Sequence, residues 1–451
     1  MKFICILIVI LFSIQCYSQE LTEKPNILFI LVDDLGQHQL GSYGSTFYET
    51  PCIDKLAKEG MKFNNAYAAA SICSPTRASI MTGKYPARLH LTNYIPAASK
   101  LYRKLLAPNW KKHLPLEEVT LAESLQKAGY ATGHFGKWHL NINKKYSEHR
   151  LGDPASQGFD DVFTSHKPNA GSASIYNEDW HHVKEITERA ISFIENNKSK
   201  PFFCYVSHNS IHNPEIEKEN LVKKYSNKPG AKKSGNLNPV QAAMLETLDK
   251  SVKTILDKLE ELKIANNTIV VFFSDNGHLG PKDGKLFRGS KGDLYEGGIR
   301  MPLIIKWPKV IKSSSLCEEV VISNDFFSTF NEIANVSSSS DVDGLSLLPL
   351  LNDSEAKLNR EAVYWHFPHY HISGIAPQGA MRMGRYKLIE WFEKSSYGET
   401  DAFELYDLID DPREQKNLAD LMPDVTSKLK KNLSLWRKSV GAQMMTMQDE
   451  K

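Results

Sequence analysis

The 451-residue sequence has little cysteine, no strong excess of charge and no long apolar run in its interior. Its six cysteines are too few for a scaffold built on disulfides. The formal net charge of +2 lacks the basic excess that is typical of nucleic-acid binders, so we expect no nucleic-acid partner. Beyond the N-terminal segment, no apolar run is long enough to cross a bilayer, so we expect no transmembrane anchor. Hydrophobic content of 41% and charged content of 24% are those of a globular protein.

The N-terminal segment has the pattern of a secretory signal peptide over residues 1–18. Lys2 precedes an apolar run from Phe3 to Ile14, and the segment ends in Cys16-Tyr17-Ser18, which suits a cleavage site. The run is short for a membrane span. Lipid attachment at Cys16 is less favoured, because Gln15 is not the small residue that precedes such sites. We therefore expect a secreted or periplasmic protein.

Strands and helices alternate through most of the sequence. Three apolar runs without polar alternation predict strands that are buried on both faces, namely Asn26–Val32, Phe202–Val206 and Thr268–Phe273. Apolar residues at three- and four-residue steps predict helices over Leu116–Lys127, Asn177–Asn196 and Val240–Leu262, with a solvated loop over Lys218–Leu237. This alternation predicts an α/β fold with a mostly parallel, doubly wound sheet flanked by helices.

The character of the chain changes near residue 359. Gly379–Trp391 and Phe403–Leu408 alternate as antiparallel strands would, and Pro423–Val440 has helical spacing. We expect a large α/β domain over residues 19–355 and a smaller α+β subdomain, an antiparallel sheet plus a helix, over residues 356–451.

Polar side chains follow each of the three buried strands, at the edge of the sheet where open α/β folds bind ligands. Asp33, Asp34, Asp275 and Asn276 form an all-oxygen set that suits a hard cation such as Ca²⁺ or Mg²⁺. The alternatives are a helix-capping turn after the first strand and a hairpin turn at Asn276-Gly277. The polar, glycine-rich segment that follows Gly277 disfavours the hairpin.

The stretch SICSPTRASIMTG places Cys73 at the start of a predicted helix. Pro75 suits the first turn, and Gly83 suits the C-terminal end. The helix dipole is expected to lower the pKa of the Cys73 thiol, and Arg77 lies one turn further along. The alternative is a buried or helix-capping cysteine without chemistry.

Cys73-x-Pro75-x-Arg77 followed by Thr82-Gly83 closely resembles the pattern of the formylglycine-dependent (type I) sulfatases. The two metal motifs, Asp33-Asp34 and Asp275-Asn276-Gly277, match that family too. Three further motifs match in the family's order: Gly136-Lys137-Trp138-His139, Ile211-His212-Asn213-Pro214, and Lys291-Gly292 ahead of Tyr295-Glu296-Gly297-Gly298. The resemblance covers nearly the whole mature chain and points to the arylsulfatase A-like branch of the alkaline phosphatase superfamily.

The resemblance implies an alkaline phosphatase-like fold and a modified cysteine. A separate formylglycine-generating or anaerobic sulfatase-maturating enzyme would convert Cys73 to formylglycine (3-oxoalanine), whose hydrate is the nucleophile. With Cys73 modified, at most one disulfide can form among the other mature cysteines. The implied metal ligands are Asp33, Asp34, Cys73, Asp275 and Asn276, with Ca²⁺ preferred over Mg²⁺.

The resemblance also implies roles for cations and imidazoles around a sulfate ester, which needs positive charge at its oxygens and an acid for the departing alcohol. Arg77 and Lys137 would stabilise the nucleophile, and Lys137 with Lys291 would hold sulfate oxygens. His212 would protonate the leaving alcohol, and His139 would remove a proton from the second hydroxyl to expel sulfate. His212 would also contact the substrate.

The aromatic and histidine-rich run from Tyr364 to His371 resembles segments that close over the substrate in related bacterial enzymes. His366 and His369 are accordingly candidate substrate-binding residues. A packing loop within the C-terminal subdomain is an equal alternative.

Three functions compete at this point. The first is a secreted sulfatase that hydrolyses a sulfated carbohydrate. The second is a phosphomonoester or phosphonate hydrolase of the same superfamily, which the complete Cys-x-Pro-x-Arg motif disfavours. The third is a non-catalytic binder of sulfated glycans, which requires Cys73 to remain a thiol.

Overall fold

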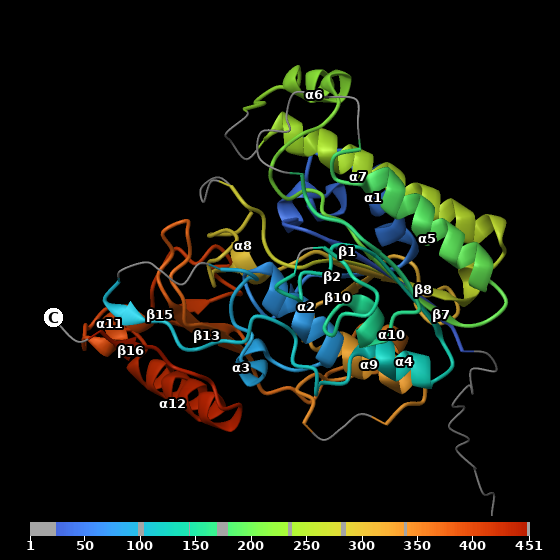
Figure 1. Ribbon diagram of the computed structural model, residues 1–451. Coiled ribbons are helices and arrows are strands. Elements are labelled where there is room, and N and C mark those ends of the chain that lie inside the picture. Colours follow the sequence, from blue (N-terminus) through green and yellow to red (C-terminus); the bar gives the residue numbers. More distant parts are fainter. Residues whose placement is uncertain are drawn as a thin grey trace, which may run out of the picture.

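The structure, a computed structural model, describes residues 24–97, 103–143, 145–168, 179–232, 237–280, 286–337 and 341–448. The signal peptide expected over residues 1–18 lies outside these ranges. Figure 1 shows a large sheet with helices on both faces and a smaller sheet beside it. Within the described ranges, we find no helix with the length and apolar character that a membrane crossing requires.

The large sheet has eight strands in the order β10-β2-β9-β8-β1-β7-β5-β6. Their bounds are β1 Asn26–Val32, β2 Met61–Phe63, β5 Ala131–Gly136, β6 Asp161–Thr164, β7 Phe202–Ser207, β8 Thr268–Ser274, β9 Leu303–Lys306 and β10 Ser315–Cys317. Strand β1 lies between β7 and β8 and pairs parallel with both. Strand β9 pairs antiparallel with β8 and β2. The prediction of a mostly parallel sheet is confirmed.

Helices cover both faces of this sheet (Figure 1). One face carries α1 Pro51–Glu59, α5 Val183–Asn197 and α7 Pro239–Glu261, and the other carries α2 Cys73–Thr82, α4 Leu121–Lys127, α9 Asp325–Ile333 and α10 Leu348–Asn352. Successive residues of β1 enter different cores: Phe29 packs in the same cluster as Phe326 of α9, and Ile30 in the cluster of Leu248 of α7. Because both faces are covered, β1 has no polar alternation.

The C-terminal part contains an antiparallel sheet in the order β12-β13-β14-β15. The bounds are β12 Val363–Phe367, β13 Gln378–Met383, β14 Tyr386–Trp391 and β15 Phe403–Asp407, followed by α12 Pro423–Ser439. Leu433 of α12 and Leu388 of β14 share one hydrophobic core. The predicted antiparallel sheet and helix are confirmed, although the stretch Gly379–Trp391 is a two-stranded hairpin. The boundary at residue 355 stays a prediction.

The remaining elements are short. They are α3 Pro86–Leu89, α6 Glu219–Ser226, α8 Glu296–Ile299, α11 Phe392–Ser396, β3 Ala66–Tyr67, β4 Leu105–Leu106, β11 Val321–Ile322, β16 Thr446–Met447, and the 3-10 turns Gln37–Gln39, Gly41–Tyr43, Pro154–Gln157 and Ala265–Asn267.

Two predictions of secondary structure are wrong in part. Helix α4 begins at Leu121 rather than Leu116, because the Thr120 hydroxyl accepts from the Glu123 amide at 3.1 Å and forms a capping box. The segment predicted as a loop over Lys218–Leu237 contains α6. Tyr225 of this helix is buried and donates to Glu246 at 2.8 Å. The charged composition of the segment gave no indication of this buried contact.

The N-terminal end of α5 also differs from the prediction. The helix begins at Val183, and positions 177 and 178 of the predicted helix lie outside the described residues.

Candidate active site

Strands β1 and β8 end at the same level, because Val32 pairs with Ser274 in the parallel register. The amide of Asp275 therefore donates to the carbonyl of Val32 at 3.1 Å. Beyond the strand ends, the Asn276 side chain donates to Asp34 Oδ1 at 2.7 Å. Residues more than 240 positions apart in the chain thus form one polar cluster at the carboxyl edge of the sheet.

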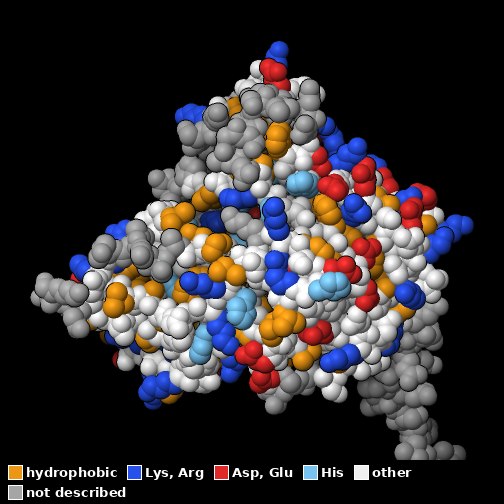
Figure 2. Space-filling model, in the orientation of Figure 1, with side chains coloured by type: hydrophobic (Ala, Val, Ile, Leu, Met, Phe, Trp, Pro, Cys, Tyr) orange, Lys and Arg blue, Asp and Glu red, His pale blue; other side chains and the backbone are white. Residues whose placement is uncertain are grey.

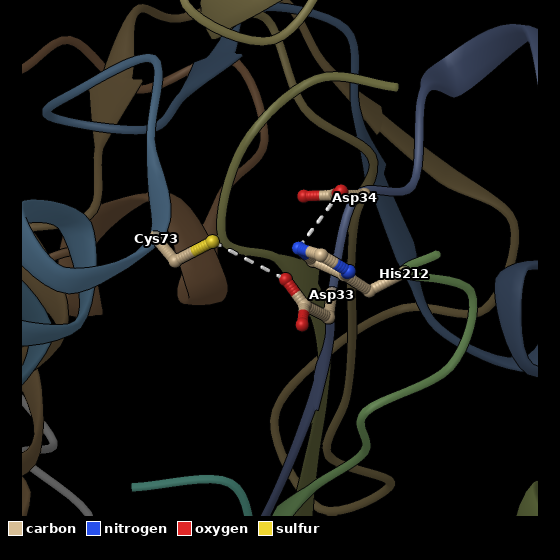
Figure 3. Close-up of side chains that lie close together, drawn as sticks. All are labelled: Asp33, Asp34, Cys73 and His212. Carbon is tan, nitrogen blue, oxygen red and sulfur yellow. Dashed lines mark hydrogen bonds and ion pairs between the residues drawn. The ribbon is translucent and has the colours of Figure 1, made fainter. Parts of the chain in front are cut away.

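Helix α2 begins at Cys73 and ends before Gly83, which adopts a left-handed conformation at φ 69°. The predicted helix is confirmed, with Pro75 in its first turn. The Cys73 thiol donates to Asp33 Oδ1 at 3.4 Å, and Lys291 Nζ lies 3.3 Å from Sγ. Figure 3 shows the Cys73, Asp33, Asp34 and His212 side chains converging, and their ligand atoms lie within 4.8 Å of one another.

Three buried cations pair with three buried carboxylates around this point. We call these six residues the catalytic cluster, after the roles predicted for them: Arg77 with Asp275, Lys137 with Asp33, and Lys291 with Asp34. The shortest N···O distances are 2.7 Å for the Arg77 pair and 2.6 Å for each lysine pair. The structure therefore brings the predicted acidic and basic residues into direct contact.

Arg77 is held by more than its carboxylate. Its Nη1 donates to the Lys137 carbonyl at 2.8 Å and to Ser207 Oγ at 2.6 Å. The chain can make this approach because Gly136, at φ 116°, lies against the Ser207 carbonyl, where a Cβ atom would come within 1.9 Å. Gly136 therefore sets the position of Lys137.

Burial controls the protonation of Cys73. Desolvation, and then the charges of Asp275 and Asp33, raise the pKa of the thiol to about 12. The expectation that the helix dipole lowers this pKa is wrong, because Cys73 is 1% exposed and faces carboxylates. The unmodified side chain is a neutral thiol at physiological pH.

The carboxylates respond unequally to burial. Burial raises the pKa of Asp34, and burial with the charge of Asp33 raises the pKa of Asp275 to about 6. Burial acts on Asp33 in the same direction, but the charges of Lys137, then His212 and Lys291, hold its pKa well below the usual value. Further positive charge at this edge would favour the ionised form of all three.

Oxygen atoms in the cluster lack partners that a cation would supply. Asp34 Oδ2 and Asn276 Oδ1 are buried and accept no hydrogen bond from the described residues. Carboxylate and amide oxygens are the ligands that Ca²⁺ and Mg²⁺ prefer, so this donor set fits a hard cation. The group of atoms within 4.8 Å includes His212, which was not a predicted ligand, and does not include Asp275.

The two predicted catalytic histidines lie at this edge with different hydrogen bonds. His139 Nε2 contacts the Ile95 carbonyl, and its buried Nδ1 has no partner in the described part of the chain. His212 Nδ1 lies 2.6 Å from the Asn213 carbonyl, and its Nε2 lies 3.7 Å from Asp34 Oδ2. Burial, and then a nearby lysine charge, hold the pKa of both imidazoles well below the usual value.

Comparison with known proteins decides the family of this chain. The sulfatase family model matches residues 25–336, and the model of the C-terminal part of N-sulphoglucosamine sulphohydrolase matches residues 289–439. The chain belongs to the sulfatase family. It is a sulfuric ester hydrolase with the alkaline phosphatase-like fold that the sequence predicted.

Two relatives and two solved structures illustrate the match. An arylsulfatase of Hemicentrotus pulcherrimus is 31% identical over 87% of this chain and 77% of its own length. An N-acetylgalactosamine-6-O-sulfatase of Bacteroides thetaiotaomicron is 27% identical over 92% and 94%. A protein solved with its substrate D-glucosamine-2-N,6-O-disulfate has a TM-score of 0.73 at 23% identity, covering 93% and 98%. A phosphonate monoester hydrolase of Agrobacterium radiobacter has a TM-score of 0.70 at 18% identity, covering 94% and 100%.

His366 and His369, the predicted substrate-binding residues in the C-terminal part of the sulfatase, each contact another residue of the protein. His366 Nε2 lies 2.9 Å from the Gln443 carbonyl, and His369 Nε2 lies 2.8 Å from Thr92 Oγ1. Both rings are buried, which lowers the pKa of each to about 3. These contacts favour the alternative of a packing loop.

A neighbour in the same run lies closer to the catalytic cluster. A Cβ atom on Gly292, the residue after Lys291, would come within 3.2 Å of His371 Nδ1. The His371 ring also stands edge-on to Tyr94, with ring centroids 6.0 Å apart.

Three polar residues at this edge had no predicted role. Ser207 contacts Arg77, Ser274 Oγ accepts from the Leu35 amide at 3.0 Å, and Lys167 Nζ lies 3.3 Å from His212 Nδ1. Ser207 and Ser274 are the last residues of β7 and β8, and Lys167 follows β6. The available signal was position, since each stands at the carboxyl end of a strand.

Proposed function

We propose that this sulfatase hydrolyses sulfate esters of a sulfated carbohydrate, an oligosaccharide or polysaccharide, with a nucleophile derived from Cys73 and a divalent cation. One observation carries the proposal: Cys73 Sγ lies in a buried cluster that has both carboxylates for a cation and ammonium groups for an anion. A site for a sulfate ester needs a bound cation and ammonium groups, because the negative charge of the sulfate is spread over several oxygens.

Conversion of Cys73 to formylglycine, by a formylglycine-generating or anaerobic sulfatase-maturating enzyme, fits the geometry better than use of the thiol. A pKa of about 12 leaves almost no thiolate at neutral pH, and the thiolate is the reactive form of cysteine. The aldehyde, once hydrated, would supply a hydroxyl nucleophile at the same position.

Asp33, Asp34, Asp275 and Asn276, with the modified residue 73, would hold the cation. Ca²⁺ is our first choice and Mg²⁺ the alternative, since all the protein donors are oxygens. When bound, the cation would polarise oxygen atoms at the site and favour a hydroxyl nucleophile.

The ammonium groups of Lys137 and Lys291 would bind sulfate oxygens. Lys291 Nζ already spans Asp34 and Cys73, at 2.6 and 3.3 Å. Arg77 is 1% exposed and contacts Asp275, Ser207 and the Lys137 carbonyl, so its role would be to fix the nucleophile and Lys137.

His139 is suited to accept a proton, because Nε2 faces a carbonyl and Nδ1 carries an unused lone pair. His212 is suited to donate one to the leaving alcohol from Nε2. Burial and Lys291 depress the pKa of His212, so the negative charge of a bound sulfate would be needed to favour its protonated form.

The relatives support a carbohydrate substrate. The N-acetylgalactosamine-6-O-sulfatase is similar over nearly its whole length, and the fold matches that of a protein bound to a disulfated glucosamine. The expected signal peptide supports action outside the cytoplasm, in the periplasm or after secretion, where such polysaccharides are met.

The test measures sulfate and phosphate release by enzyme whose formylglycine content is verified by mass spectrometry. Substrates are sulfated mono- and oligosaccharides and matched phosphate esters, and Cys73→Ala is the control. We expect sulfate release from one sulfated position, lost in Cys73→Ala. Phosphate release alone would transfer the proposal to the phosphomonoester and phosphonate hydrolases. Glycan binding by a chain whose native Cys73 stays a thiol would indicate a non-catalytic binder.

A further inference from the structure

Lys167 is a cation of the active-site edge that the proposed mechanism does not use. It follows β6, whose carboxyl end lies at the same edge as those of β5 and β7. Its Nζ lies 3.3 Å from His212 Nδ1 and 3.3 Å from Asn213 Oδ1. Lys167 is thus two contacts away from Asp34, through the His212 ring.

Its surroundings differ from those of the catalytic lysines. Lys137 and Lys291 are buried and each pairs with a carboxylate, whereas Lys167 is exposed and pairs with no carboxylate of the described residues. Figure 2 shows Lys and Arg side chains, in blue, in the middle of the pictured face of the molecule, and red Asp and Glu side chains mainly in its right and lower parts. The ammonium group of Lys167 therefore has its charge available to a ligand.

Asn213 adds a second donor beside it. The Asn213 side chain is exposed, and its oxygen faces Lys167 Nζ. The other half of this amide, the NH₂ group, has no acceptor in the described part of the chain. An ammonium group and an amide NH₂ on adjacent exposed side chains suit an anionic oxygen, because charge-assisted hydrogen bonds are the stronger kind.

The charges of the catalytic cluster reach Lys167. Partial burial lowers its pKa first, the charges of Lys137 and Lys291 lower it further, and Asp33 and Asp34 oppose them. An anion bound beside Lys167 would offset this repulsion between like charges. The catalytic cluster itself has equal numbers of cationic and acidic side chains, so it has no spare side-chain cation for a second anion.

We propose that Lys167 and Asn213 form a subsite for a second anionic group of the substrate, a sulfate or a uronic-acid carboxylate on the same sugar or its neighbour. This rests on the proposed function, because the first sulfate must sit at the catalytic cluster. It deepens that function by selecting carbohydrates with more than one anionic group over singly sulfated neutral sugars.

The experiment compares Lys167→Met and Lys167→Arg with wild type. The matched control is Lys55→Met, which removes one exposed lysine charge far along the chain, on α1. The probes are a monosulfated hexosamine, a disulfated hexosamine, and a monosulfated hexosamine joined to a uronic acid. The quantity compared is the ratio of kcat/KM for each doubly charged probe to kcat/KM for the monosulfated one, so a general loss of activity cancels.

We expect Lys167→Met to lower this ratio about tenfold, mainly through KM, as for loss of one charge-assisted hydrogen bond. Lys167→Arg should keep most of the ratio, Lys55→Met should match wild type, and added salt should reduce the wild-type preference. The probe whose ratio falls identifies the second anion as sulfate or carboxylate. An unchanged ratio for both doubly charged probes in Lys167→Met overturns the inference.

A binding measurement separates this inference from the proposed function. The same probes are titrated by calorimetry into Cys73→Ala, with and without Lys167→Met, in the presence of Ca²⁺. Weaker binding of a doubly charged probe in the double variant supports the subsite even if wild type releases no sulfate, a result that would overturn the proposed function alone. Equal binding overturns the subsite.

Discussion

Two buried ion clusters in this molecule differ in how completely the protein encloses them. The clamp cluster consists of Lys387, Glu296 and Glu414, and the Lys387 ammonium lies 2.9 Å from Glu296 and 2.8 Å from Glu414. All three side chains are 0% exposed. In the catalytic cluster, by contrast, Lys137 and Lys291 retain slight exposure, at 10% and 8% of the side chain.

The protein satisfies the clamp cluster from several directions. Glu296 also accepts from the Tyr67 hydroxyl at 2.7 Å, and Glu414 Oε2 accepts from the Glu296 amide at 2.7 Å. These contacts join α8, which follows the Lys291 segment, to β14 and the loop after β15. Glu414 Oε1 accepts no hydrogen bond but lies 2.8 Å from the Lys387 ammonium, whereas Asp34 Oδ2 of the catalytic cluster and the neighbouring Asn276 Oδ1 accept none and have no cation of the described residues at such a distance. We therefore expect the clamp cluster to stabilise the fold and the catalytic cluster to bind a ligand.

The largest expected effect is on catalysis, at Lys291. Lys291→Met should lower kcat about 10³-fold, since it removes a cation from the transition-state charge. Lys84→Met is the matched control, because Lys84 is as enclosed, at 10% exposure, and pairs with Glu118 away from the site. Steady-state kinetics and urea unfolding with Ca²⁺ present should show lost activity with retained stability. A loss of stability that accounts for the lost activity would contradict the assignment.

The clamp cluster should respond in the opposite way. Lys387→Met leaves buried Glu414 without its cation and removes one of the two cations that pair with Glu296, the other being Arg300, so the free energy of unfolding should fall by about 3–5 kcal/mol. The double variant Lys387→Met/Glu414→Gln should recover part of this loss. Urea denaturation of the three proteins measures the effect. Equal stability of wild type and Lys387→Met would show that the cluster does not hold the two parts together.

Removal of the proposed cation from the catalytic cluster should lower the stability of the folded protein. With Ca²⁺ at 100 times its Kd, binding adds about 2.7 kcal/mol to the free energy of unfolding. We therefore expect a chelator to lower both activity and Tm in wild type, and added Ca²⁺ to restore both. Asp34→Asn should lose the Ca²⁺ response of Tm. A wild-type Tm that is indifferent to chelator and Ca²⁺ would argue against a cation at this site.

The smallest expected effect is the pH dependence of the clamp cluster. Burial raises the pKa of Glu414 from 4.5 to about 7. The charge of Lys387 opposes this shift, and the charge of Glu296 adds to it. Folding thus favours the protonated form, so this group's stabilising contribution is full below pH 4.5 and is lost as the pH rises through about 7. Relative to Glu414→Gln, wild type should lose on the order of 2 kcal/mol across this window.

Unfolding free energies from urea titrations at several pH values measure that difference. Glu414→Gln keeps an oxygen acceptor for the Glu296 amide, so the comparison isolates the ionisation. Parallel pH profiles for the two proteins would show that folding does not raise the pKa of Glu414.

The sequence allowed prediction of features that depend on local pattern. Asn26–Val32 forms the buried strand that its residues indicate, with the same bounds. The carboxylates after β1 and β8 meet because parallel strands end at one edge. The glycine-rich segment after Gly277 correctly disfavoured a hairpin, since the Gly277 amide instead donates to the Gly298 carbonyl at 3.0 Å.

Features set by tertiary surroundings were not predictable in the same way. The thiol of Cys73 is neutral because of burial and the nearby carboxylates of Asp275 and Asp33, which come from other parts of the chain and outweigh the local helix dipole. The sequence could not show which histidine after residue 364 lies near the site. Only the folded chain shows that His366 contacts the Gln443 carbonyl, whereas His371 lies beside Gly292. Lys167 belongs to no recognised sequence motif, and only the folded chain shows that its ammonium group lies next to His212.

Cys73 is 1% exposed in the folded chain, and this has a consequence for timing during synthesis. About 200 residues separate Cys73 from Asp275, whose strand must pair with β1 before the site can close. At 5–20 residues per second, a ribosome needs roughly 10–40 s to make that stretch. The maturation enzyme proposed above would have an interval of this length in which the cysteine is still accessible, and slower translation between the two segments should then raise the fraction of chains in which Cys73 is converted.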